Sequence, residues 1–261
     1  MAKILRLILL VVAFLCAGTI PNRAQRTHRH TEQGPGCRPA VTRMEDCPPT
    51  GCGDVADPFL NLMKNRTEIP PHPMPQDLTF IRRLHEPHTW TRGQARSSDI
   101  FRFEYKAVVV MAFLVGSRVS GSETANCRLT GQRNSDFILR LDSLRSSVPA
   151  QTVTAEVTPR VRPSGWTFEK LQELTNQKAF VRVTGWLMLD TEHIKSRLVR
   201  STNWEIHPVT KLEFCTQTVT KCRGGDGWKD LQDSSTENNS TVTTNPPMII
   251  PPREQAGPPV R

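Results

Sequence analysis

Aromatic residues are scarce in this sequence, with a single tyrosine among 261 residues and an aromatic content of 6%. Proteins that bind single-stranded nucleic acids stack successive bases on aromatic side chains, so such a platform would have few members here. The formal net charge is +9, but the lysines and arginines are not gathered into one tract. Charge therefore gives only a weak expectation of nucleic-acid binding.

Several signatures of catalysis and metal binding are also missing. The chain has no GxSxG, no GxxxxGK[ST], no HExxH and no GxGxxG after an expected strand. No CxxC pair occurs, which disfavours a zinc site built from cysteines. The sequence therefore predicts no metal centre and no cofactor. It favours a noncatalytic protein, although missing motifs do not exclude an enzyme.

The chain begins with two basic residues, Lys3 and Arg6, followed by an apolar run to about Gly18 and then by small residues. This order is typical of a secretory signal peptide, which we place at residues 1–24 with cleavage after Gly18 or Ala24. The run is shorter than the roughly 18 to 20 residues that span a bilayer, so no stable transmembrane span is expected after cleavage. An uncleaved N-terminal anchor is the alternative.

Removal of a signal peptide would leave an even number of cysteines. In an oxidising compartment these are expected to form disulfides, whose connectivity the sequence alone does not choose. The short spacing makes Cys215 and Cys222 the most plausible local pair. The candidates are Cys37, Cys47, Cys52, Cys127, Cys215 and Cys222.

Composition divides the mature chain into three parts. Residues 25–100 are rich in proline and polar residues, so we expect an irregular segment with one short helix near 58–65, capped by Asp57. Residues 101–222 can build a core. Residues 223–261 have too little apolar surface to offset their ordering entropy, and we expect a disordered tail.

The middle part alternates like a β protein. Strands are expected at 105–116, 136–143, 151–160, 178–190 and 203–215, with a bulge near Pro208. Between the third and fourth strands the apolar period changes to that of a helix, which Thr167 can cap. Three strands, a helix and two strands is the order of the OB-fold, a five-stranded Greek-key barrel. The sequence thus predicts a mainly β protein with an OB-fold-like domain.

Two motifs, GWLMLDTEH and WEIHPVTKLEFC, together with AEVTPRVRPSGWTFEKL and GCGDVADPFLNLMKNR, resemble those of an uncharacterised family of exported bacterial proteins. The resemblance implies an OB-fold-like domain and a periplasmic or secreted setting. It transfers no catalytic residue. Thr124 and Ala125 stand where relatives have a second cysteine near Cys127, which puts a disulfide within that loop in doubt.

The expected hairpin of the last two strands fixes the direction of its side chains. If Leu189 faces Trp204 and Leu187 faces Ile206, both apolar sets lie on one side of the sheet. The opposite face then places Trp186 beside His207 and Met188 beside Glu205. We expect an outward patch that either binds a ligand or receives the N-terminal segment, with packing favoured. Its residues are Arg182, Trp186, Glu205 and His207, with His193 nearby.

Three functions remain open, of which the third is an interaction protein whose proline-rich N-terminal segment docks on the barrel or on a partner. The first is an exported noncatalytic OB-fold-like module that binds an unknown protein or polymer in the bacterial envelope. Its loops would carry the basic residues Arg118, Arg128, Arg133, Lys195, Arg197 and Arg200.

The alternative function is a hydrolase or nuclease that uses Asp190, His193, Glu205 and His207, with Glu192 nearby. We favour the interpretation that these five side chains form a solvated turn and an outer strand face, because surface carboxylates and histidines are common around hairpins.

Overall fold

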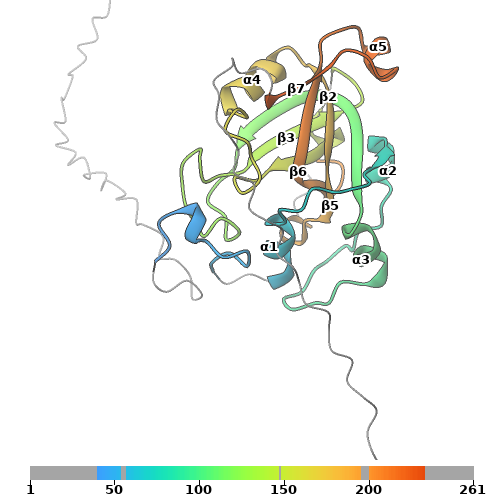
Figure 1. Ribbon diagram of the computed structural model, residues 1–261. Coiled ribbons are helices and arrows are strands. Elements are labelled where there is room, and N and C mark those ends of the chain that lie inside the picture. The colour runs from blue at the N-terminus through green and yellow to red at the C-terminus, as the bar shows by residue number, and fades with distance from the viewer. Residues whose placement is uncertain (1–39, 54–56, 147, 195–199, 233–261) are drawn as a thin grey trace, which may run out of the picture. The chain divides into compact units, whose positions relative to one another are not determined.

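The structure is a computed structural model that describes residues 40–53, 57–146, 148–194 and 200–232 (Figure 1). These residues belong to the second of the two units into which the chain divides, Gln33–Arg261. The expected signal peptide and Cys37 lie outside the described residues. Among the residues that are described, no helix has the length and hydrophobicity needed to cross a membrane.

Five strands form a closed barrel, which confirms the predicted mainly β, OB-fold-like architecture. They are β2 (Ala107–Val119), β3 (Phe137–Asp142), β4 (Val153–Val157), β5 (Phe180–Leu189) and β6 (Trp204–Cys215). Neighbouring strands run in the order β2–β3–β4–β6–β5, and β5 returns to β2. A parallel contact between Ala155 and Ile206 joins β4 to β6, whereas the other barrel pairs are antiparallel.

The barrel interior is filled by alternate residues of each strand, as the sequence pattern predicts. In β5 the inward residues Val181, Val183, Leu187 and Leu189 are fully buried. The helix α4 (Phe168–Asn176) lies between β4 and β5, and the Thr167 hydroxyl accepts a hydrogen bond from the Lys170 amide. The expected order of strands and helix is therefore confirmed.

The predicted register of the β5–β6 hairpin is also confirmed. Leu189 pairs with Trp204, Leu187 with Ile206 and Met188 with Glu205. The register then shifts on either side of Gly185, so β6 carries extra residues around Pro208, as expected for a bulge. The bulge falls where Trp186 and His207 were expected to pair, and this one pair is not in the register.

The N-terminal segment is more regular than the prediction for residues 25–100. It contains a 3₁₀ turn (Met44–Asp46), α1 (Pro58–Lys64), β1 (Met74–Gln76), α2 (Leu78–Arg82) and α3 (Ser98–Glu104), of which only α1 was expected. Side-chain oxygens of Asp57, Asp77 and Ser97 cap the three helices. Local capping and burial against the barrel thus order a segment whose prolines suggest irregularity.

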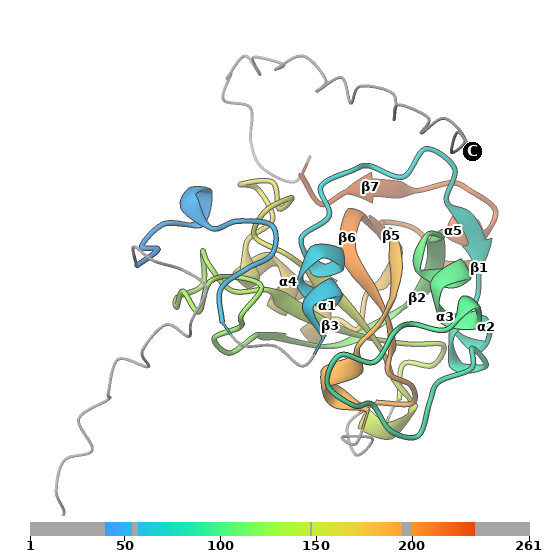
Figure 2. The ribbon, with the colours of Figure 1, turned by 90° about the horizontal axis from the view of Figure 1, so that it is seen from below.

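This segment covers part of the outer wall of the barrel. Helix α1 contributes the buried Leu60 and Met63, which form one apolar cluster with Met188 of β5. Met188 points away from the barrel interior, yet it is fully buried. Figure 2 shows α1 lying close to β6. The outer face of the hairpin is therefore covered by protein rather than by solvent.

The beginning of the expected tail is ordered, contrary to the prediction for residues 223–261. After α5 (Val219–Arg223), β7 (Trp228–Asp230) pairs with the end of β6, and the following Leu231 is buried. The Trp228 indole also donates a hydrogen bond to the Cys222 carbonyl over 2.7 Å. Sheet pairing and one buried apolar side chain therefore stabilise the start of this segment, although its composition is polar. Residues 233–261 lie outside the described residues.

Two disulfides connect described cysteines. Cys215 and Cys222 are joined, as the spacing suggested. Cys47 bonds to Cys127, which links the N-terminal segment to the β2–β3 loop instead of closing a bridge within that loop. Cys52 is disulfide-bonded as well. Two further 3₁₀ turns complete the structure, at Pro149–Gln151 and Thr191–His193.

Candidate functional site

A cleft of about 450 Å³ lies on the face of the barrel where OB-folds bind their ligands. That face is built from the second and third barrel strands, here β3 and β4, and from the loops that follow the first and the fourth. Helix α1 adds one wall. The lining residues include Lys64 of α1, Arg118 of β2, Glu123 and Arg128 of the β2–β3 loop, Arg140 of β3, Glu156 of β4, and Asp190, Glu192, His193 and Arg200 after β5.

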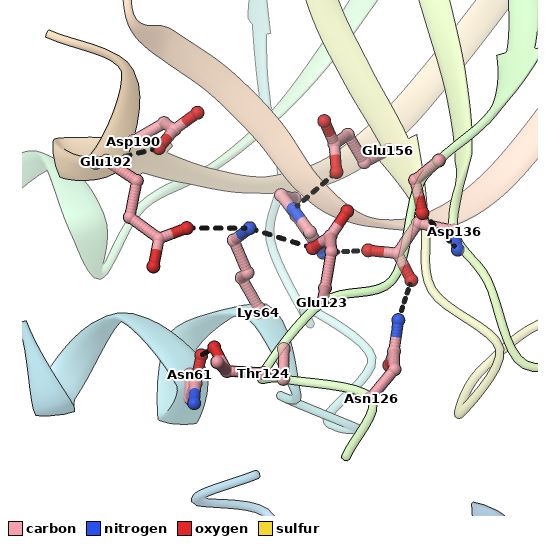
Figure 3. Close-up of polar contacts among 12 residues, drawn as sticks. Asn61, Lys64, Glu123, Thr124, Asn126, Asp136, Glu156, Asp190 and Glu192 are labelled. Carbon is pink, nitrogen blue, oxygen red and sulfur yellow. Dashed lines mark hydrogen bonds and ion pairs between the residues drawn. The ribbon is translucent and has the colours of Figure 1, made fainter. Parts of the chain in front are cut away.

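Lys64 brings a cation from α1 into a group of carboxylates (Figure 3). Its ammonium nitrogen lies 3.0 Å from Glu123 Oε2 and 4.0 Å from Glu192 Oε2. Burial opposes the charged form of Lys64, but Glu123 and Asp190 outweigh it and hold the lysine pKa well above its usual value. Lys64 therefore stays protonated and ties α1 to the β2–β3 loop.

Arg200 holds two further carboxylates. Its guanidinium contacts Asp190 Oδ2 at 2.7 Å and Glu205 Oε2 at 3.1 Å. Burial disfavours the charge on Asp190, yet hydrogen bonding to His193 and the charges of Lys64 and Arg200 lower the Asp190 pKa strongly. The same hydrogen bond, 2.6 Å long, raises the pKa of His193. Asp190 is thus an ionised centre that orders the start of the β5–β6 connection.

His207 lies at the base of the cluster and is fully buried. Its Nδ1 is 3.1 Å from Glu205 Oε1 and 3.4 Å from Glu156 Oε2, and its Nε2 is 3.5 Å from Asp136 Oδ2. Burial raises the pKa of Asp136 to about 6 and of Glu205 to about 8, and it raises that of Glu156 well above the usual value. The three carboxylates therefore resist ionisation as long as no further cation balances them.

The structure confirms the expected solvent exposure for Glu192 and His193 but corrects it for the other hairpin residues. It brings together Asp190, His193, Glu205 and His207, as the sequence suggested, but only the side chain of His193 is substantially exposed, at 52%. Glu205 and His207 do point away from the barrel interior, as the register requires. Helix α1 and the β2–β3 loop cover them, so they form part of a buried charged cluster rather than a surface patch.

The other two residues of the expected patch lie elsewhere. Arg182 pairs with Glu213 through two hydrogen bonds and lines a separate cleft of about 1240 Å³. The Trp186 indole donates to the Glu68 carbonyl over 2.9 Å, and the Arg66 guanidinium lies 5.0 Å from the centre of its ring. The N-terminal segment therefore packs on Trp186, which was the favoured alternative. The expected patch is not one continuous surface.

Four central residues were not identified from the sequence as site residues: Lys64, Glu123, Asp136 and Glu156. Two of them carried a usable signal, because Glu156 interrupts the apolar third strand at an outward position and Asp136 immediately precedes the second strand. Lys64 carried none, since its burial depends on how α1 docks. Of the six basic residues expected near the OB-fold loops, Arg118, Arg128 and Arg200 line the cleft and Arg133 does not. Lys195 and Arg197 lie outside the described residues.

No protein-family model matches the chain, and no curated protein or solved structure is detectably similar to it.

Proposed function

We propose that the protein is an exported, noncatalytic OB-fold-like module whose cleft binds a ligand carrying an anionic group. The observation behind this proposal is the position of the cleft, which is bounded by β3, β4 and the two loops that OB-folds use for recognition. An exported setting accords with the disulfides, which form and persist in oxidising compartments.

The charge of the cleft wall favours an anionic group on the ligand. Arg118 and Arg128 make no ion pair within the described part of the chain, whereas Lys64 and Arg200 are already engaged by carboxylates. Arg118 is exposed and Arg128 half-buried. A guanidinium at the mouth of a cleft is suited to bidentate contact with a carboxylate, sulfate or phosphate group.

Binding of anionic polymers tests the proposal. Fluorescent heparin and a single-stranded DNA oligonucleotide would be titrated with the protein at low and moderate salt, with neutral dextran as a reference. We expect at least one anionic probe to bind with an affinity that falls as salt rises. The double variant R118E/R128E should bind at least ten times more weakly.

The matched control is K221E/K229E, which makes the same change in net charge at two exposed lysines of α5 and β7. This variant should retain most of the affinity. Equal losses in both variants would show that binding follows net charge rather than the cleft. Binding of dextran alone would also contradict the proposal.

A hydrolase or nuclease is the second candidate. One observation favours it: the His207 imidazole lies among carboxylates from β4, from β6 and from the residue before β3, next to the cleft. Such groups can serve general acid–base or metal-assisted hydrolysis. Hydrolysis of phosphodiester, phosphomonoester and ester substrates would be screened with and without divalent metal. No turnover in any condition, with binding unchanged in H207A, would exclude this candidate.

A further inference from the structure

The carboxylates of the buried cluster are unequally supplied with cations. Glu123 and Glu192 face Lys64, and Asp190 faces Arg200. Glu205 also has Arg200, at 3.1 Å. Each of these four acidic side chains therefore lies within ion-pair distance of a cation, with Lys64 and Arg200 each shared by two of them.

Asp136 and Glu156 have no such partner among the residues described. In the described part of the chain, the basic group within ion-pair distance of each is His207, which can supply at most one positive charge. Asp136 and Glu156 are 1% and 7% exposed. Burial of an ionised carboxylate is costly without a compensating charge, so this arrangement calls for one.

Three polar atoms at and around the His207 ring make no hydrogen bond. They are Asp136 Oδ2, Glu156 Oε2 and His207 Nε2, and each is buried. The opposite ring nitrogen, Nδ1, has Glu205 Oε1 as a hydrogen-bond partner at 3.1 Å. If Nδ1 carries the proton, Nε2 presents a lone pair toward Asp136 Oδ2, and two acceptors face each other.

We propose that Asp136, Glu156 and His207 form a binding site for a divalent metal ion, with Zn²⁺ as the ion that best fits the ligand set. One imidazole and two carboxylates suit zinc, which takes nitrogen and oxygen ligands at about 2.0 to 2.2 Å. The two charges of the ion would balance the two carboxylates that lack a cation.

The distances agree with this ligand set. Two atoms about 2.1 Å from a tetrahedral ion lie roughly 3.4 Å apart, and His207 Nε2 is 3.5 Å from Asp136 Oδ2. One ligand atom from each of the three residues lies within 4.8 Å of the others. Glu156 Oε2 lies 3.4 Å from the other ring nitrogen, Nδ1, so this side chain must turn toward Nε2 to complete the set.

The surrounding residues also support a metal centre. Asn126 donates to Asp136 Oδ1 over 2.8 Å, which turns Oδ2 toward His207. Glu205 orients the imidazole through Nδ1, and such outer contacts are typical of metal-ligating histidines. Glu156 lines the cleft, so an ion can enter along that carboxylate. The inference does not rest on the anionic ligand proposed above.

Calorimetric titration with Zn²⁺ tests this centre. The full mature chain would be dialysed against a chelator, then against buffer, and titrated with Zn²⁺ alone. We expect one ion per chain, and at least tenfold weaker binding in D136N, E156Q and H207Q. E205Q, which alters the orienting contact and also the ion pair with Arg200, should weaken binding by about 10- to 100-fold. Co²⁺ loading should give visible absorption bands that these variants lose.

E213Q is the matched control, because Glu213 is another carboxylate on the outer face of β6 but is engaged by Arg182. It should bind Zn²⁺ like the native protein. Circular dichroism would establish that each variant is folded. If D136N does not fold, E156Q replaces it in the test, because Glu156 lies at the edge of the cluster. The proposal is overturned if the native chain binds no Zn²⁺, or if folded E156Q and H207Q bind it with native affinity.

Discussion

Replacing Lys64 with methionine should be one of the most destabilising single changes in the protein. Methionine matches the length and much of the volume of lysine, so the substitution removes the charge with little effect on packing. Lys64 is only 4% exposed, and its ammonium lies 3.0 Å from the Glu123 carboxylate. Burial works against the ionised form of Glu123, but Lys64 lowers its pKa overall. Without the lysine, a largely buried carboxylate loses its cation.

Breaking a buried ion pair by removing one partner costs about 3 to 5 kcal/mol. For a domain of this size, that loss lowers the melting temperature by roughly 10 °C. Urea denaturation followed by tryptophan fluorescence, with disulfides intact, would measure the free energy of unfolding. The control is K221M, which removes an exposed lysine of helix α5 and should change stability by less than about 0.5 kcal/mol.

The double variant K64M/E123Q separates charge from packing. Because the glutamine needs no cation, the double variant should be more stable than K64M by at least about 1.5 kcal/mol. A loss below about 1 kcal/mol in K64M would refute the argument that this pair is buried and structurally important. Strictly additive losses in the double variant would refute the coupling of Lys64 to Glu123.

Three further changes test the fold. G185A should lower the free energy of unfolding by about 1 to 3 kcal/mol, because an added Cβ would lie 2.4 Å from the Pro208 carbonyl oxygen. Chemical denaturation that gives the native free energy of unfolding would contradict the bulge geometry. C47S/C127S opens a crosslink between residues 80 apart and should lose about 4 kcal/mol, measured the same way, whereas a negligible loss would argue against the bridge. Burial raises the pKa of Glu104 to about 7. The folded state therefore binds more protons than the unfolded state between pH 4.5 and 7, and stability falls as pH rises through this range. E104Q removes the pH dependence that Glu104 contributes. The free energy of unfolding of E104Q relative to that of the native protein should therefore rise by up to about 3 kcal/mol between pH 4.5 and 8. Free energies of unfolding that change in parallel with pH in the two proteins would contradict the raised pKa.

The barrel could be predicted from the sequence because each strand follows local rules. Alternating apolar residues identify the inward face of β5, and the Thr167 cap marks the start of α4. The hairpin register follows from the requirement that Leu187 and Leu189 share one side with Trp204 and Ile206. These are contacts between neighbouring strands, which short-range patterns specify well.

The candidate site was harder to predict, because its residues come from five separate stretches of the chain. Nothing local indicates that Lys64 on a short helix reaches Glu123 nearly sixty residues later. Glu205 and His207 were correctly placed on the outer strand face but taken to be solvated. Alternation tells which side of a strand a residue occupies, but it does not tell what covers that side. Here α1 and the β2–β3 loop cover it, held partly by the Cys47–Cys127 disulfide.

The most direct test of the account is an anomalous difference map from crystals of the mature protein grown with Zn²⁺, measured on both sides of the zinc absorption edge. The account predicts one strong peak between His207 Nε2 and Asp136 Oδ2, about 2 Å from each, with Glu156 completing the ligand set next to the cleft. A zinc-free cluster in which His207 lies hydrogen-bonded between Asp136 and Glu156, with any zinc bound only at other histidines, would contradict it.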